Sequence, residues 1–386
     1  MNKFFPEFDH PPNRVGSCSL KWDRYDDPDV IPLWVADMDF KSPQSVLETV
    51  RHSSEHGNFG YGNPPSGLFE IIVSRTSELY NWTIDPNWIV WLPGMVCALN
   101  VTCRALTGEA SKAIIQTPIY PPFLTASANF DLPLAKVPLT LDNGRFTIDF
   151  RSLSELKTQP GDLFMLCHPH NPVGTLFNKE ELNLLIQWVV ERDLYLCSDE
   201  IHCDLILDDE LQHIPPASLD HRIAEKTITL MAPSKTFNIA GFGCSFAVIS
   251  NPGLRAKFKK AMRGIVPDPP ALGFLLAEAA YRDGEAWRFS LIKYLRGNRE
   301  LAMSALNEME GLVPYSPEAT YLLWIDATNL PVDRPHKFFE ENGVGLSDGT
   351  DFDAPGFLRL NLGCSRKLLS EALARMSKAC KNLSLP

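Results

Sequence analysis

The amino-acid sequence predicts a mixed α/β fold, in which a mostly parallel sheet lies between two layers of helices. Five short apolar runs, bounded by polar residues, Pro or Gly, carry this prediction, because a strand buried on both faces is apolar throughout. They are residues 113–116, 163–167, 194–197, 227–230 and 246–249. A helical pattern follows the second run, and strand, helix and strand in this order form a right-handed crossover unit. The prediction is therefore a three-layer α/β/α domain.

That helix is predicted over residues 178–193. Asn178 can cap its first turn, and Glu181 completes a variant of the capping box. Apolar residues then repeat at helical spacing, namely Leu182, Leu185, Ile186 and Val189. The segment therefore has both a start signal and a face that can be buried against the sheet.

A second, smaller α+β domain is predicted toward the end of the chain. A chain of 386 residues with 45% apolar content is long enough for two domains. Leucines repeat at helical spacing between residues 284 and 310, and Gly311 ends the pattern, which predicts a long helix leaving the large domain. We expect a large domain of residues 45–285 and a small domain built from residues 1–44 and 286–386.

The composition argues against some classes of partner. A formal net charge of -11 disfavours nucleic acid, whose phosphate backbone attracts a basic surface. No run approaches the ~18 apolar residues of a membrane span, and the first residues lack the apolar core of a signal peptide. The nine cysteines are scattered, odd in number and without a CxxC pair, which is typical of free thiols in a reducing compartment. We therefore expect a cytoplasmic protein.

Three polar segments each follow a predicted strand. They are residues 170–175, 198–202 and 231–241. Sheets of this class bind ligands beyond the carboxyl ends of their strands, so we expect these segments to meet at one site. The third segment contains Lys235, an amine at a strand end where an aldehyde cofactor could condense with it. The plain alternative is a lysine in a surface loop.

A metal site is a second interpretation of the same region. Six possible ligands could cluster at neighbouring strand ends, namely Cys167, His168, His170, Cys197, His202 and Cys203. The prolines Pro169 and Pro172, and the absence of zinc-finger or HExxH spacing, weaken this interpretation. Small buried cysteines are the commoner explanation, so we expect no metal.

With these motifs the chain resembles the fold-type I pyridoxal phosphate enzymes of the aminotransferase class I/II superfamily, whose fold is aspartate aminotransferase-like. Within that superfamily it is most similar to the cystathionine β-lyase-like C-S lyases of the MalY/PatB type. The resemblance covers nearly the whole chain, through residues 32–40, 60–62, 118–123, 170–175, 199–204, 234–241 and 357–361. Several ordered motifs at consistent separations make it specific.

The resemblance implies a role for each residue around the cofactor ring. Lys235 would hold pyridoxal 5'-phosphate covalently and then act as the base at the substrate Cα. Asp199 would pair with the pyridine nitrogen, Asn171 would bind the phenolic oxygen, and Tyr120 would stack on the ring. His202 stands where many aminotransferases carry a tyrosine. Its contact stays open, and a structural histidine is the alternative.

The cofactor phosphate is implied to lie at a helix start. Residues 94–97 resemble the family turn, whose backbone N–H groups, at Met95 and Val96, would bind the phosphate. Two positions depart from the pattern, because Ala232 replaces a hydroxyl residue and Gly243 replaces an arginine that some aminotransferases carry. Ser234 and Thr236 are the remaining nearby hydroxyl candidates.

The substrate and the partner subunit have implied contacts as well. Arg359 resembles the arginine that clamps the α-carboxylate of an amino-acid substrate with its planar fork. The N-terminal arm, with Ala36, and the strand of residues 321–324 are expected to wall the same pocket. Tyr61 resembles the tyrosine that reaches the cofactor phosphate of a neighbouring subunit, which implies a homodimer.

The implied reaction is α,β-elimination from cystathionine or another S-substituted cysteine, giving a thiol, pyruvate and ammonia. Aminotransfer on an L-amino acid is the alternative, because the same lysine can return the proton to the cofactor. A regulatory or binding protein that keeps the fold is a further alternative, since a fold does not guarantee activity.

Overall fold

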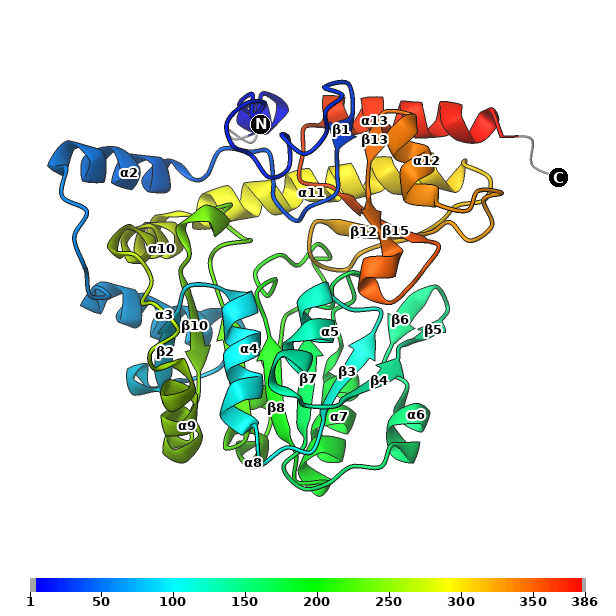
Figure 1. Cartoon of the computed structure of the whole chain (residues 1–386). Helices are drawn as coiled ribbons and strands as arrows, with labels where there is room; N and C mark the ends of the chain where they lie inside the picture. Colours follow the sequence, from blue (N-terminus) through cyan, green and yellow to red (C-terminus); the bar gives the residue numbers. More distant parts are fainter. Residues whose placement is uncertain (1–4, 384–386) are drawn as a thin grey trace.

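The structure, a computed structural model, describes residues 5–383. Its largest sheet has seven strands in the order β2-β10-β9-β8-β7-β3-β4 (Figure 1). The strands are β2 (Ile89–Leu92), β3 (Ala113–Thr117), β4 (Leu134–Pro138), β7 (Leu163–Cys167), β8 (Tyr195–Asp199), β9 (Thr227–Met231) and β10 (Ser245–Val248). β10 is antiparallel to both of its neighbours, and the pairs from β9 to β4 are parallel. The predicted α/β class and its mostly parallel sheet are confirmed.

Helices cover both faces of this sheet, which explains why its strands are apolar on both faces. Ile115 and Met165 join a core cluster with residues of α4 (Met95–Leu106), α5 (Pro121–Ala126) and α9 (Pro252–Met262). Their neighbours Ile114 and Phe164 join a different cluster, with residues of α6 (Phe150–Glu155), α7 (Lys179–Glu191) and α8 (His221–Ala224). Alternate side chains of one strand therefore enter opposite layers.

The predicted helix between β7 and β8 is α7. Asn178 caps it, its side chain accepting from the Glu181 backbone N–H at 2.9 Å. The Glu181 carboxylate accepts in return from the Asn178 N–H at 2.9 Å, so the predicted capping box is present. The helix and its two parallel strands bring the ends of β7 and β8 to the same edge of the sheet.

The C-terminal part forms a second, four-stranded sheet in the order β11-β12-β15-β14. Its strands are β11 (Val313–Tyr315), β12 (Leu322–Asp326), β14 (Ser347–Asp348) and β15 (Phe357–Asn361), and its helices are α12 (Pro335–Glu341) and α13 (Arg366–Lys381). The predicted long helix is α11 (Glu285–Asn307), which passes under α13 (Figure 1). The domain boundaries at 44/45 and 285/286 stay a prediction.

The N-terminal arm lies on the C-terminal part. Its strand β1 (Ile31–Pro32) pairs in parallel with β13 (Val344–Gly345). The remaining elements are α1 (Phe5–Asp9), α2 (Gln44–His56), α3 (Ser66–Tyr80), α10 (Ala271–Asp283) and the hairpin of β5 (Thr140–Asp142) and β6 (Arg145–Thr147). Between residues 5 and 383, no helix has the length and apolar character needed to cross a membrane.

Candidate active site

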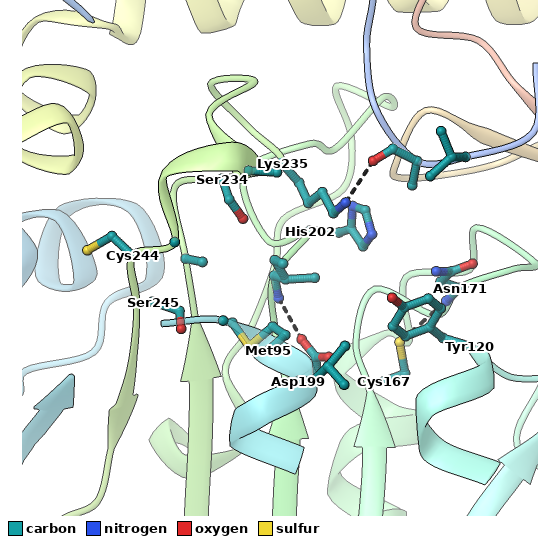
Figure 2. Close-up of a pocket in the computed structure, with 18 of the residues that line it drawn as sticks. Met95, Tyr120, Cys167, Asn171, Asp199, His202, Ser234, Lys235, Cys244 and Ser245 are labelled. Atoms are coloured by element: carbon teal, nitrogen blue, oxygen red, sulfur yellow. Dashed lines mark hydrogen bonds between the residues drawn. The ribbon is translucent and has the colours of Figure 1, made fainter. Parts of the chain in front are cut away.

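The three polar segments meet at one edge of the large sheet, as predicted. Strand pairing places Cys167 beside Asp199, and Asp199 beside Leu230, so β7, β8 and β9 end together. A cavity of about 220 Å³ opens there (Figure 2). Ten of the eleven predicted site residues line it, namely Ala36, Met95, Val96, Tyr120, Asn171, Asp199, His202, Ser234, Lys235 and Arg359.

Lys235 extends from the loop after β9 into the cavity. Its Nζ donates to the backbone oxygen of Ala36 at 2.7 Å (Figure 2). Burial lowers the pKa of the amine to about 8, with Asp37 and Asp199 opposing the shift and the Arg359 charge adding to it. A substantial fraction of the amine is therefore neutral near pH 8, which is the form that attacks a carbonyl or accepts a proton.

Asp199 lies at the floor of the cavity, at the end of β8. Its Oδ1 accepts from the Ile201 backbone N–H at 3.1 Å. Burial raises the pKa of this carboxyl to about 7, and the Ile201 hydrogen bond opposes the shift. Asp199 forms no ion pair with any residue from 5 to 383. A cationic ring nitrogen placed here would meet a buried carboxylate that lacks a counter-charge.

Arg359 enters the cavity from β15 of the smaller sheet. Its guanidinium donates to Asn171 Oδ1 at 3.0 Å, to the Trp34 oxygen at 3.0 Å and to Ser347 Oγ at 3.3 Å. No carboxylate within the described chain pairs with it, and its buried Nε has no partner there. Burial lowers the pKa of Arg359 to about 10, against the influence of Tyr120, Tyr321 and Asp351. A buried cation in this state favours an anionic ligand.

The hydrogen bond from Arg359 also orients Asn171. Because the amide oxygen of Asn171 accepts from Arg359, its NH₂ group is left to donate to another acceptor. Tyr120, at the start of α5, lies beside Asn171 on the same wall of the cavity (Figure 2). The ring and the amide donor therefore flank the space above Asp199.

His202 belongs to the loop after β8, and its ring lies beside the Lys235 side chain (Figure 2). Burial lowers the pKa of its imidazole to about 3, and the charges of Lys235 and Arg359 lower it further. The ring is thus neutral at every pH at which the protein is expected to work. Its Nδ1 has no partner within residues 5–383, so the contact that the sequence left open stays open.

The other end of the cavity has the features of an anion site. Helix α4 begins there at Met95, after Gly94, and the first N–H groups of a helix have no partner within it. Figure 2 shows the Ser234 hydroxyl turned toward this end. Thr236, the other hydroxyl candidate, is wrong for this role, because its hydroxyl donates to Asp204 at 3.4 Å, outside the cavity.

Tyr61 is the one predicted site residue that lies elsewhere. It belongs to the loop between α2 and α3 and is fully exposed. It lines a separate surface hollow together with Phe242 and Pro270. Within a single chain, Tyr61 therefore does not contribute to the cavity.

Sequence reasoning missed Ser245, expected Tyr321 only as part of a strand walling the pocket, and considered Cys167 only as a metal ligand. Tyr321 is buried, and its hydroxyl donates to the Ala36 oxygen at 3.1 Å. Ser245 lines the anion end, and its hydroxyl donates to the Leu92 oxygen at 3.0 Å. Cys167 lines the floor beside Asp199, where the pairing of two predicted parallel strands places it, and not as part of a metal site. Among residues 5–383, no group of three His, Cys, Asp or Glu side chains could hold a metal ion.

Known proteins similar to this chain include several whose structures were solved with bound pyridoxal 5'-phosphate. The family model "Aminotransferase class I and II" matches residues 28–376. The cystathionine β-lyase PatB of Bacillus subtilis is 34% identical over 384 residues, which cover 96% of this chain and 99% of the relative. The crystal structure of OvoB superposes with a TM-score of 0.94 at 42% identity, covering 97% of this chain and 99% of that one. Cystalysin from Treponema denticola, solved with pyridoxal 5'-phosphate, has a TM-score of 0.91 at 33% identity, covering 98% and 99%.

Proposed function

The chain belongs to the aminotransferase class I and II family and, within it, to the MalY/PatB group of cystathionine β-lyases, and we propose that it cleaves a carbon–sulfur bond. It is a pyridoxal-phosphate-dependent β-lyase, which converts cystathionine or another S-substituted cysteine and water into a thiol, pyruvate and ammonia. One observation carries this function. The cavity joins a buried amine of lowered pKa, Lys235, to a carboxyl, Asp199, and a guanidinium, Arg359, neither of which forms an ion pair within residues 5–383.

The residues present fit the cofactor. When bound, pyridoxal phosphate supplies an aldehyde for an amine and an electron sink for the Cα carbanion. Lys235 is the amine proposed to hold it, and Asp199 is the carboxylate proposed to keep the ring nitrogen protonated. The free NH₂ of Asn171 is proposed to donate to the phenolic oxygen, and Tyr120 to pack on the ring. His202 adds a neutral imidazole next to Lys235.

The phosphate is proposed to lie at the start of α4. The backbone N–H groups of Met95 and Val96 and the hydroxyl of Ser234 supply donors there. Ala232 and Gly243 also line this end and supply no side-chain donor. The donors that one chain is proposed to offer the phosphate are therefore mainly backbone N–H groups and carry no positive charge.

The substrate is an amino acid. Its α-carboxylate is proposed to bind Arg359, which has no other anion within the described chain. The unprotonated Lys235 amine then takes the Cα proton, and the C–H electron pair forms a bond to Cβ. The Cβ–S pair leaves with sulfur, which gains a proton as the thiol. Ala36, whose oxygen faces Lys235, walls the same space.

A homodimer is the proposed active form. Tyr61 is exposed, and the apolar side chains of Phe59, Phe242 and Leu275 are exposed around the same hollow, which suits contact with a second copy. In that dimer Tyr61 would reach the cofactor phosphate of the neighbouring subunit and add a donor to an end that is poor in charge. A cytoplasmic location is proposed as well, because all nine cysteines are unpaired.

A reaction assay tests the proposed function. The purified protein is loaded with pyridoxal phosphate and given cystathionine or S-methylcysteine, with and without an added 2-oxo acid as amino acceptor. The lyase forms pyruvate at the same rate in both conditions. Aminotransfer would form the oxo acid of the substrate only when the acceptor is present. Failure to release pyruvate from every S-substituted cysteine tested would refute the lyase.

A further inference from the structure

The segment from Trp34 to Met38, here called the strap, is irregular backbone, and its residues Val35 and Ala36 line the cavity. Buried carbonyl groups in such a segment need hydrogen-bond donors from elsewhere. Every strap carbonyl accepts from at least one side chain, and the Val35 carbonyl also accepts from the Asp37 backbone N–H at 2.9 Å. The side-chain donors are Arg359 and Ser347 to Trp34, Asn361 to Val35, Lys235 and Tyr321 to Ala36, Asn361 and Lys21 to Asp37, and Arg14 and Asn238 to Met38.

The carbonyl of Ala36 differs from the others because one of its donors is the reactive lysine. Its oxygen accepts from Lys235 Nζ at 2.7 Å and from the Tyr321 hydroxyl at 3.1 Å. A carbonyl oxygen has two lone pairs, so both donors can bind at once. One backbone atom therefore connects the reactive lysine to a tyrosine of the smaller domain.

Hydrogen bonds from Asn361 on either side of the Ala36 carbonyl, and from Tyr321 to its oxygen, hold that oxygen in place. Asn361 Nδ2 donates to the carbonyls before and after it, at 2.6 Å to Val35 and 2.9 Å to Asp37, so the peptide cannot turn independently. Tyr321 is only 1% exposed, and its backbone oxygen accepts from the Leu362 N–H at 2.7 Å. Its ring and the His202 ring pack in a T-shaped arrangement, with centroids 6.0 Å apart. Tyr321 is thus a rigid support for the strap.

A carbonyl suits this task better than a carboxylate does. A carboxylate at hydrogen-bond distance would stabilise the ammonium form of Lys235, whereas a neutral oxygen accepts from the amine without fixing a charge on it. A neutral amine that donates one N–H to the strap also directs its lone pair away from the strap. The remaining space is the cavity, where the substrate Cα lies in the proposed function.

We propose that Tyr321 is a positioning residue for Lys235, acting through the Ala36 carbonyl to hold the free amine with its lone pair turned into the cavity. This inference rests on the proposed function only in assuming that Lys235 removes a Cα proton. Tyr321 is not among the residues that line the cavity, and its hydroxyl reaches the Lys235 amine only through the Ala36 oxygen. Its loss is expected to slow proton transfer, because a small misplacement of a base has a large effect on rate.

The test compares Tyr321→Phe, which deletes only the hydroxyl, with Tyr315→Phe as the matched control. Tyr315 is a buried tyrosine of β11, in the small sheet whose strand β12 begins just after Tyr321, and it lies outside the cavity. The rate measured is the exchange of the Cα hydrogen of L-alanine with solvent deuterium, followed by NMR. L-Alanine has no leaving group, so exchange reports proton transfer whether the enzyme is a lyase or an aminotransferase.

Tyr321→Phe is expected to lower the maximal exchange rate about tenfold, with a smaller change in the KM for L-alanine and in cofactor affinity. Tyr315→Phe should behave as the wild type does. A wild-type exchange rate in Tyr321→Phe would overturn the inference. A loss in which cofactor affinity, KM and Tm all change together would also overturn it, since that pattern indicates a structural role only.

A second measurement uses the cofactor-free protein, so it remains available if the loaded variant is unstable. Pyridoxal phosphate is added at pH 8, and the absorbance of its link to Lys235 is followed in time. Capture by Tyr321→Phe should be several-fold slower, and equal capture rates would contradict the inference. A wild type that captures the cofactor but exchanges no Cα hydrogen would refute the proposed function instead, and the capture rates would still decide the role of Tyr321.

Discussion

Arg359 Nη1 donates to Asn171 Oδ1 at 3.0 Å, across 188 positions of sequence. The bond connects β15 of the smaller sheet to the loop after β7 of the large sheet. It sets the orientation of two groups at once, the fork proposed to bind the substrate carboxylate and the amide proposed to donate to the cofactor ring. Because Asn171 is neutral, the bond leaves the positive charge of Arg359 available to an anion.

Asn171→Asp should make the positive charge of Arg359 unavailable to a substrate anion. The new carboxylate would pair with Arg359 in a buried setting and compete with the α-carboxylate of the substrate. We expect KM for cystathionine to rise on the order of tenfold or more. Asn171→Ser is the control, since it shortens the side chain without adding a charge. Equal KM values for the two variants would show that charge competition at Arg359 is not the cause.

Asp199→Asn should stabilise the cofactor-free protein at pH 8. The pKa of Asp199 is raised by burial from 3.8 to about 7, so the folded state binds this proton more tightly than the unfolded state. Stability from this group is therefore present below about pH 4 and is lost as the pH rises toward 7. We expect the Tm of the variant to exceed that of the wild type by about 2 °C or more at pH 8, and by less at pH 5.

Asp199→Asn should also reduce the stabilisation that bound pyridoxal phosphate gives to the protein. The neutral amide of the Asp199→Asn variant would leave the ring nitrogen without a counter-charge, so the variant should gain less Tm from pyridoxal phosphate than the wild type does. Calorimetry of both proteins, with and without cofactor at pH 5 and pH 8, measures both effects: the higher Tm of the cofactor-free variant and its smaller gain in Tm from the cofactor. A cofactor-free variant that is less stable than the wild type at pH 8 would contradict the unpaired state of Asp199.

Lys235→Ala should abolish the absorbance band of the cofactor–lysine link. The carboxyl of Asp199 and the donors around α4 remain, so the variant should still bind pyridoxal phosphate, with lower affinity. Lys259→Ala, on the exposed face of α9, serves as the control for loss of a lysine. A band that persists in Lys235→Ala would place the covalent link on another amine. A colourless wild type that cannot be loaded would favour a binding protein.

Subunit complementation tests the proposed position of Tyr61. Protomers of Lys235→Ala and Tyr61→Ala are each expected to be nearly inactive, since one lacks the base and the other lacks a donor to the partner's phosphate. In a mixed dimer, one of the two sites would contain both native residues. After unfolding and refolding of an equal mixture, about a quarter of the wild-type activity should return. No recovery in mixed dimers would place Tyr61 in the site of its own chain or outside any site.

Much of the large domain could be predicted because burial on both faces leaves a strong signal. The strands β3, β7, β8 and β9 coincide with short, mainly apolar runs, and the capping box marks the start of α7. The edge strand β4 gave no such signal, since its residues, among them Lys136, are largely accessible to solvent. The helix start at Met95 was found only through the family resemblance.

The geometry around Lys235 could not be predicted from residue types. Its partner is a backbone oxygen, and any residue at position 36 would supply one. Tyr321 reaches the same oxygen across 285 positions of sequence, and nothing in its local pattern distinguishes it from a core tyrosine. The orientation of Ser234 into the cavity and of Thr236 toward Asp204 likewise depends on how the loop after β9 turns.

A single-turnover experiment tests the elimination most directly. The loaded enzyme is mixed with one equivalent of cystathionine, without an amino acceptor, and pyruvate, thiol and cofactor absorbance are followed together. We expect one pyruvate and one thiol for each substrate consumed, with the cofactor absorbance returning to its starting spectrum. An absorbance that stays changed, with one oxo acid of the intact substrate formed and no thiol, would contradict the elimination.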